Sequence, residues 1–244
     1  MLRTRPSIVL FFTRSQRRRH PHRQVLLALG ALVFLAVLLG PPPPAAAVVS
    51  SFRSTDAIAL TFDDGPDPVN TPALLSLLAS YGVHATFFVV GTEVARHPDL
   101  LRAEVAAGHE IGLHTYYHRA LPRLSNGALL ADLGAESRLL QQVAGTHTIL
   151  VRPPYGSLSE RTTTTLREAG YEVVFWSADT RDWASGQAAI QSFLINQVKP
   201  GDIVLMHDGG GPRAATIAAL AAALPVWIGR HWHFRTISQL PAGH

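Results

Sequence analysis

The feature that most constrains this chain is a regular alternation of short apolar runs with longer helical stretches, which begins near residue 48. The runs have the length and residue types of strands, and glycines stand where several helices should end. Strands that alternate with helices favour a parallel sheet built from βα units, and hence an α/β fold. Strands are expected at 58–62, 84–90, 110–113, 148–151, 171–177, 202–206 and 232–236, and helices at 71–81, 93–107, 126–143, 159–169, 187–198 and 213–229.

The alternation alone leaves the shape of the sheet open. The expected strands and helices fit a closed barrel of βα units, and they fit an open doubly wound sheet as well. No internal repeat, long linker or low-complexity segment interrupts the pattern after Ser50. Residues 48–244 are therefore expected to form one domain.

The first 47 residues differ in composition from the remainder. Residues 1–24 carry seven arginines and no acid, and the uncharged stretch at 25–47 contains a sixteen-residue apolar run followed by prolines and small residues. A positive region, an apolar core and a small-residue site are typical of a secretory signal peptide, and the same stretch also fits an uncleaved membrane anchor. Either way, residues 48–244 are expected outside the cytoplasm, secreted or anchored to the plasma membrane.

The basic N-terminus also accounts for the overall basicity of the chain. The remaining 14 basic residues are outnumbered by 17 acidic ones, so residues 48–244 carry a net charge of −3. A nucleic-acid-binding surface is therefore not expected. The sequence contains no cysteine, which excludes disulfides and thiolate metal ligands. Any metal site in this chain must use His, Asp or Glu.

Five polar clusters each follow the carboxyl end of an expected strand. In βα folds, the loops at that end of the strands converge on one site. Each cluster alone has an ordinary interpretation as a turn, a helix cap or a surface loop, so it is the joint placement that indicates a functional site. The clusters are Asp63-Asp64, His114 with His118, Arg152 to Tyr155, Asp179 with Asp182-Trp183, and His207-Asp208.

These residue types suit hydrolysis of an amide or an ester. Two imidazoles and one carboxylate form an open ligand set for a divalent transition metal, which activates water and polarises a carbonyl. A second carboxylate can serve as a general base, and a separate histidine can protonate the leaving group. The sequence has no Gly-rich dinucleotide or phosphate loop and no Gly-x-Ser-x-Gly elbow, which disfavours hydride transfer, phosphoryl transfer and a serine hydrolase.

In order and spacing, the clusters resemble the motifs of the polysaccharide deacetylases, a carbohydrate-esterase group that includes chitin, chitooligosaccharide, peptidoglycan and acetylxylan deacetylases. The resemblance covers nearly all of 55–240, and 85–91 looks like the family's second strand. The matching stretches are Thr61-Phe-Asp-Asp-Gly-Pro66, His114-Thr-Tyr-Tyr-His118, Arg152-Pro-Pro-Tyr-Gly156, Asp179-Thr-Arg-Asp-Trp183 and Leu205-Met-His-Asp208.

The resemblance implies a distorted (β/α)7-type barrel. It also implies a hydrolase that removes N-acetyl groups from an extracellular polysaccharide or oligosaccharide, with one divalent metal ion that is usually zinc. By this resemblance, the metal ligands are Asp64, His114 and His118, the general base is Asp63, and Arg152 pairs with that base. The general acid is His207, and Asp182 pairs with it. The backbone N–H of Tyr155 is expected to bind the oxyanion, and Trp183 and Leu205 are expected to line the acetyl pocket.

Two positions depart from the family's usual pattern without removing a ligand. Leu113 stands where a small polar residue is common, and Tyr117 where a small residue is common. Two alternative functions stay open: an esterase that removes O-acetyl groups from xylan-like polymers, and a non-catalytic glycan-binding module anchored at the membrane. The expected partner is an acetylated glycan, and the membrane is a second partner if the N-terminal helix is uncleaved. The chain is expected to be a monomer.

Overall fold

The computed structural model describes residues 48–54 and 56–240. The predicted signal peptide or anchor at 1–47 lies outside the described residues. Within the described part of the chain, no helix combines the length and apolar character that a membrane span requires.

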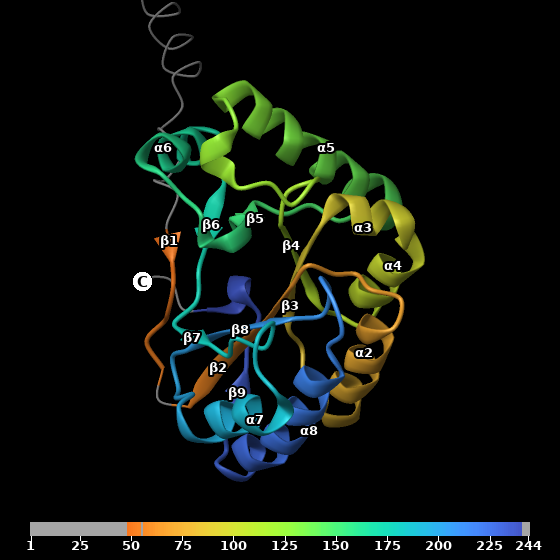
Figure 1. The fold of residues 1–244 in the computed structure, drawn as a ribbon, viewed down its shortest axis with the longest axis vertical. Helices are drawn as coiled ribbons and strands as arrows, with labels where there is room; N and C mark the ends of the chain where they lie inside the picture. Colours follow the sequence, from red (N-terminus) through yellow and green to blue (C-terminus); the bar gives the residue numbers. More distant parts are fainter. Residues whose placement is uncertain (1–47, 55, 241–244) are drawn as a thin grey trace, which may run out of the picture. The chain divides into compact units, whose positions relative to one another are not determined.

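The strands form one parallel sheet, as the sequence predicts. Its order is β1-β6-β5-β4-β3-β2-β8-β7, with β9 paired to β2. The sheet curls into a half-barrel (Figure 1), and the strands at its two ends, β1 and β7, share no ladder in the described residues. The strands are β1 Val48–Val49, β2 Ala57–Asp63, β3 Thr86–Val89, β4 Glu110–Leu113, β5 Leu150–Val151, β6 Glu172–Val174, β7 Ala178–Asp179, β8 Ile203–His207 and β9 His233–Phe234.

Helices lie on the outside of the curled sheet (Figure 1). The expected helix at 93–107 is wrong as a single element, because it breaks at His97 into two helices. Pro98 lacks a backbone N–H and begins the second of them, a position at which proline is tolerated. The helices are α2 Asn70–Tyr81, α3 Gly91–Arg96, α4 Pro98–Ala106, α5 Asn126–Ala144, α6 Glu160–Glu168, α7 Gln187–Asn196 and α8 Ala214–Gly229.

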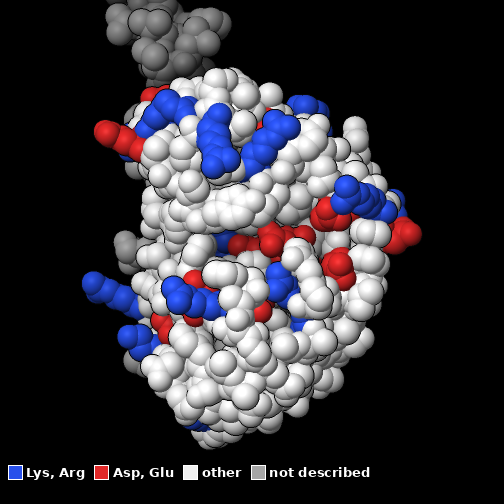
Figure 2. Space-filling model, viewed as in Figure 1, with Lys and Arg blue, Asp and Glu red and all other residues white. Residues whose placement is uncertain are grey.

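A hollow opens on the face of the molecule shown in Figure 2, and acidic side chains gather in it. It lies at the carboxyl end of the central strands, where the register sets Asp63 of β2 beside Phe88 on one side and His207 on the other. Parallel pairing therefore brings two of the polar clusters, which are far apart in the sequence, to the same height on neighbouring strands.

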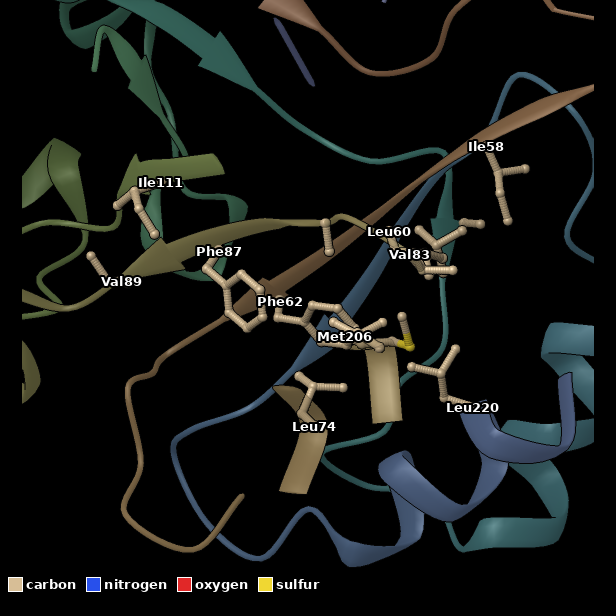
Figure 3. Close-up of a cluster of buried hydrophobic side chains, with 14 of the residues drawn as sticks. Ile58, Leu60, Phe62, Leu74, Val83, Phe87, Val89, Ile111, Met206 and Leu220 are labelled. Carbon is tan, nitrogen blue, oxygen red and sulfur yellow. The ribbon is translucent and has the colours of Figure 1, made fainter. Parts of the chain in front are cut away.

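The core forms around β2, which is buried at all seven of its positions. Burial on both faces explains why this strand reads as a continuous apolar run rather than an alternating one. Figure 3 shows Phe62 of β2 close to Phe87 of β3, Met206 of β8 and Leu74 of α2, and the Phe62 and Phe87 ring centroids are 5.3 Å apart. The strand that ends in the Asp63-Asp64 motif is thus buried along its whole length.

The burial of β2 predicts the effect of a truncation at its centre. Leu60 is fully buried, so Leu60→Ala should lower the free energy of unfolding by about 2–5 kcal/mol, through lost apolar contact and the cavity left behind. Leu130 of α5 is partly exposed, and Leu130→Ala should change it by no more than about 0.5 kcal/mol. Urea unfolding followed by circular dichroism checks both values, and equal effects would contradict the packing described.

Candidate active site

The five polar clusters lie on one rim of the sheet, as the sequence predicts. A cavity of about 530 Å³ opens on this rim. Residues from β2, β7 and β8 and from the loops after β4 and β5 line it together. Most of the side chains singled out from the sequence face this cavity, namely Asp63, Asp64, His114, His118, Tyr155, Asp179, Trp183, Leu205 and His207.

Asp64, His114 and His118 form a group that fits a divalent metal. One ligand atom from each lies within 4.8 Å of the other two. Asp64 Oδ1 is 3.0 Å from His118 Nε2 and 3.4 Å from His114 Nε2. This oxygen is buried, and it has no hydrogen-bond partner among the described residues. A buried carboxylate oxygen without a partner is costly, and a cation held by one oxygen and two imidazole nitrogens would satisfy it.

The ring of His114 is oriented by a backbone carbonyl. Its Nδ1 lies 2.8 Å from the carbonyl oxygen of Arg152. Because a carbonyl oxygen only accepts, Nδ1 carries the proton and Nε2 presents its lone pair toward Asp64. A second bond of this kind is the usual way in which proteins fix the tautomer of a metal-binding histidine.

The carboxylate of Asp64 is held in its charged form. Burial would raise its pKa, but the adjacent side chains of His114 and His118 outweigh burial, so the pKa lies well below its ordinary value. The lowered pKa favours the anionic form of Asp64. This charge state is the one that metal coordination requires.

Asp63 is held by a fully buried guanidinium. Arg152 Nη1 donates to Asp63 Oδ1 at 2.8 Å and to Thr61 Oγ1 at 2.7 Å. Arg152 Nη2 donates to the carbonyl of Phe175 at 3.0 Å, and the guanidinium carbon lies 4.1 Å from the centre of the Phe88 ring. The other oxygen, Asp63 Oδ2, remains on the side of the metal-ligand group, 3.8 Å from His114 Nε2. One carboxylate oxygen is therefore fixed and the other faces the cavity.

His207 is paired with a buried carboxylate. Its Nδ1 lies 2.7 Å from Asp182 Oδ1, and its backbone N–H donates to Asp182 Oδ2 at 2.9 Å. Thr216 of α8 donates to the same Oδ2 at 2.8 Å, which fixes the carboxylate in place. Burial would lower the pKa of His207, but the hydrogen bond to Asp182 and the charges of Asp63, Asp182 and Asp64 raise it above its ordinary value.

Two large aromatic side chains stand exposed at the cavity. Tyr155 and Trp183 are 74% and 61% exposed, whereas Leu205 is buried at the cavity floor. The Tyr155 ring packs edge-on against His118, with their centroids 4.7 Å apart. Exposed aromatic rings next to a polar centre are well suited to contact with the apolar faces of sugars.

Left-handed backbone gathers at this site. Asp64, Thr115, His118 and Tyr155 all have φ between 53° and 74°, and none of them is a glycine. Such conformations are uncommon for residues with a Cβ and are most costly for a β-branched residue such as Thr115. Nothing in the local sequence indicates them. They persist because the surrounding contacts hold the loops.

Two of those contacts come from α5 and escape the sequence analysis. Glu136 accepts a hydrogen bond from the backbone N–H of His114 at 3.1 Å, and Asp132 accepts one from Tyr116 at 2.6 Å. Burial raises the pKa of both acids, well above the ordinary value for Glu136. They lie four residues apart on a helix face otherwise made of leucines, and a polar pair on such a face is the signal that could have revealed them.

A third buried acid, Asp208, packs against the Asp63-Asp64 motif. Its Oδ2 accepts a hydrogen bond from Thr71 at 2.5 Å, and its backbone N–H donates to the carbonyl of Asp63 at 3.1 Å. Burial raises the pKa of Asp208 to about 7. A side chain at Gly65 would meet the Asp208 carboxylate at 2.2 Å, which explains the glycine at that position.

The remaining histidines described by the structure stay away from the cavity, as the sequence predicts. The His109 ring lies edge-on to the His84 ring at the opposite end of the sheet, and burial lowers the pKa of His109 to about 4. His233 is exposed, 3.8 Å from Asp56. Of the two unusual positions, Leu113 is buried at the end of β4, and Tyr117 is exposed beside the site.

The chain is similar to known carbohydrate-active enzymes over most of its described length. It is 42% identical to a peptidoglycan-N-acetylglucosamine deacetylase of Bacillus cereus over 186 residues, which cover 75% of this chain and 87% of the relative. It is 37% identical to a chitooligosaccharide deacetylase of a Bradyrhizobium species over 202 residues, with 76% and 91% of the two chains covered.

Solved structures agree with this similarity. A crystal structure of a peptidoglycan N-acetylglucosamine deacetylase superposes with a TM-score of 0.77 at 30% identity, over 80% of this chain and 92% of the other. The peptidoglycan deacetylase PdaC from Bacillus subtilis superposes with a TM-score of 0.71 at 31% identity, over 76% and 90%. The model of the polysaccharide deacetylase family matches residues 52–174. This chain therefore belongs to the polysaccharide deacetylase family.

Proposed function

We propose that this protein is a metal-dependent deacetylase that hydrolyses the N-acetyl groups of peptidoglycan or of chitooligosaccharides and releases acetate. The observation that carries the proposal is the convergence of the Asp64, His114 and His118 ligand atoms in one cavity, with Asp63 and His207 lining the same cavity. The similarity to peptidoglycan and chitooligosaccharide deacetylases supports the same class of substrate.

Asp64, His114 and His118 are proposed to hold one divalent ion, with zinc as the first candidate. Two neutral imidazoles and one carboxylate are a donor set that zinc shares with other divalent transition metals. When bound, such an ion lowers the pKa of water and polarises the acetyl carbonyl. The buried oxygen of Asp64 that lacks a hydrogen-bond partner among the described residues supports this assignment.

Asp63 is proposed as the general base and Arg152 as the residue that positions it. The guanidinium bond to Oδ1 leaves Oδ2 as the oxygen that takes up a proton from the attacking water. The buried guanidinium of Arg152 also supplies the counter-charge of this carboxylate, 2.8 Å away. In the same step, the backbone N–H of Tyr155 is proposed to donate to the developing oxyanion.

His207 is proposed as the general acid, held protonated by Asp182. With Nδ1 bonded to Asp182, the free Nε2 donates its proton to the amine that leaves the sugar. Trp183 and Leu205 are proposed to enclose the acetyl methyl group, which needs an apolar surface.

Residues 48–244 are proposed to be the catalytic domain, a distorted (β/α)7-type barrel. Residues 1–47 are proposed to be a signal peptide or membrane anchor that places this domain outside the cytoplasm. The similarity to enzymes that act on peptidoglycan supports an extracytoplasmic location.

The base and acid assignments predict a large loss of turnover without loss of fold. Asp63→Asn and His207→Ala should each lower kcat for acetate release from N-acetyl oligosaccharides by about 10²- to 10⁴-fold, the usual contribution of a positioned acid or base. Asp56→Asn and His233→Ala alter an exposed pair outside the cavity, and they should leave kcat unchanged. Near-normal turnover in either cavity variant would remove its assignment.

Faster acetate release from acetylxylan than from N-acetyl oligosaccharides would favour the esterase instead.

The pairing of His207 with Asp182 predicts the alkaline limb of the pH profile. A general acid works only while protonated, so kcat/KM should fall as the pH rises through the raised pKa of His207. Asp182→Asn removes a charge and a hydrogen bond that raise this pKa, so the alkaline limb should move to lower pH. Asp179→Asn removes a carboxylate from the same cavity without a bond to His207 and should shift the limb less. An alkaline limb unmoved by Asp182→Asn would contradict the pairing.

A further inference from the structure

A second cavity, of about 630 Å³, adjoins the active-site cavity. His118 and Tyr155 line both of them, so the second cavity begins beside the proposed metal site. We call it the arginine cavity, because two arginines contribute to its wall. Its lining residues are His118, Arg119, Ala120, Arg123, Leu124 and Tyr155.

Neither arginine of this cavity forms a salt bridge in the described part of the chain, and both Arg119 and Arg123 are exposed. The charge of Arg119 does act on the nearby Asp132: burial raises the pKa of that carboxyl, and the charge of Arg119 acts to lower it. The guanidinium of Arg119 lies over the Tyr117 ring, 4.6 Å from its centre, which restricts its position. Tyr117 is one of the two positions at which the sequence departs from the family's usual pattern.

The segment that carries Arg123 is held in place by a third arginine. Arg161 of α6 donates to the carbonyl of Pro122 at 3.1 Å and to that of Leu124 at 2.8 Å. These two carbonyls flank Arg123 on either side. The backbone under Arg123 is therefore fixed before any ligand arrives, which lowers the ordering cost of binding.

The two adjoining cavities have opposite charge. The active-site cavity is lined by three acids, Asp63, Asp64 and Asp179, and by one arginine, Arg213. The charged residues in the wall of the arginine cavity, apart from His118, are the two arginines. Figure 2 shows acidic side chains in the central hollow, with basic side chains beside them, and mainly basic side chains on the part of the same face that carries α5 and α6. A neutral sugar would form no ion pair with either guanidinium group. A carboxylate would pair with them, since the planar guanidinium matches its two oxygens.

We propose that the arginine cavity is a subsite for a carboxylate carried by the glycan next to the acetylated sugar. This inference rests on the proposed function, and it narrows the substrate class to N-acetylated glycans that bear carboxylates. The carboxylate has two possible sources: an acidic ether group on the neighbouring sugar, as in a muramic acid residue, or a peptide attached to that group. Both offer the same chemistry to Arg119 and Arg123.

The test measures the activity of the metal-loaded full chain on three substrates. They are neutral N-acetylglucosamine tetramer, a peptide-free peptidoglycan tetrasaccharide with free muramic carboxylates, and the same tetrasaccharide with its peptides attached. Arg119→Gln and Arg123→Gln remove one charge each, and Arg123→Lys retains it. The matched control is Arg167→Gln, which removes an exposed arginine of α6 that lines neither cavity.

The quantity measured is kcat/KM for each anionic substrate divided by kcat/KM for the neutral tetramer. It should fall about 5-fold in Arg119→Gln and in Arg123→Gln, the size expected of a partly exposed ion pair. It should stay near the wild-type value in Arg167→Gln, and Arg123→Lys should retain most of it. In the wild type the ratio should also fall as salt is raised, because exposed ion pairs are screened.

The outcomes separate the subsite from the proposed function. If the substrates release acetate but neither glutamine variant changes the ratio of kcat/KM values, the subsite alone would be overturned. No acetate release from any of them would overturn the proposed function, and the subsite with it. If the glutamine variants lower the ratio for the peptide-free tetrasaccharide, the ligand is the carboxylate of the sugar itself. A fall confined to the peptide-bearing substrate assigns the peptide.

Discussion

The arrangement of the site depends on one buried cation. Arg152 is fully buried, and its side chain binds Asp63 and Thr61 of β2 together with the carbonyl of Phe175. Its own carbonyl orients His114. One residue therefore holds the proposed base through its side chain and a proposed metal ligand through its backbone. Because an unpaired guanidinium in the interior is strongly destabilising, the strands that supply its partners must keep their register. The sheet and the site are in this way stabilised by the same contacts.

Two histidines in the cavity differ in the group that is bonded to Nδ1, and this group determines the protonation that each ring favours. In His114 the partner is a neutral carbonyl, which fixes the tautomer and leaves Nε2 free as a ligand. In His207 the partner is the carboxylate of Asp182, which favours the protonated ring. The proposed metal ligand and the proposed acid are the same type of side chain, and they differ in the charge of the group bonded to Nδ1. Asp63 and Asp64 differ in a similar way, since Asp63 is bonded to a guanidinium and Asp64 faces two imidazoles.

The sequence predicts the parallel α/β fold and the rim on which the polar clusters meet, because strand length, glycine position and the carboxyl-end rule are local or topological properties. It does not predict the break at His97 between α3 and α4. It also does not predict the two-residue strands β1 and β7, which are defined by their pairing with β6 and β8 rather than by a local pattern. The left-handed backbone at Thr115 and the buried acids Asp132 and Glu136 also escape it. They depend on contacts between α5 and the loop after β4, which no single segment encodes.

The central claim is that Asp64, His114 and His118 together hold one divalent ion. The most direct test is a titration of the metal-free chain with Zn²⁺, followed by calorimetry. We expect one tightly bound ion per chain, with binding lost in His114→Ala and His118→Ala and retained in His147→Ala, an exposed histidine outside the cavity. Unfolding measured on the metal-free variants establishes that they remain folded. One tightly bound ion in both His114→Ala and His118→Ala would contradict the account.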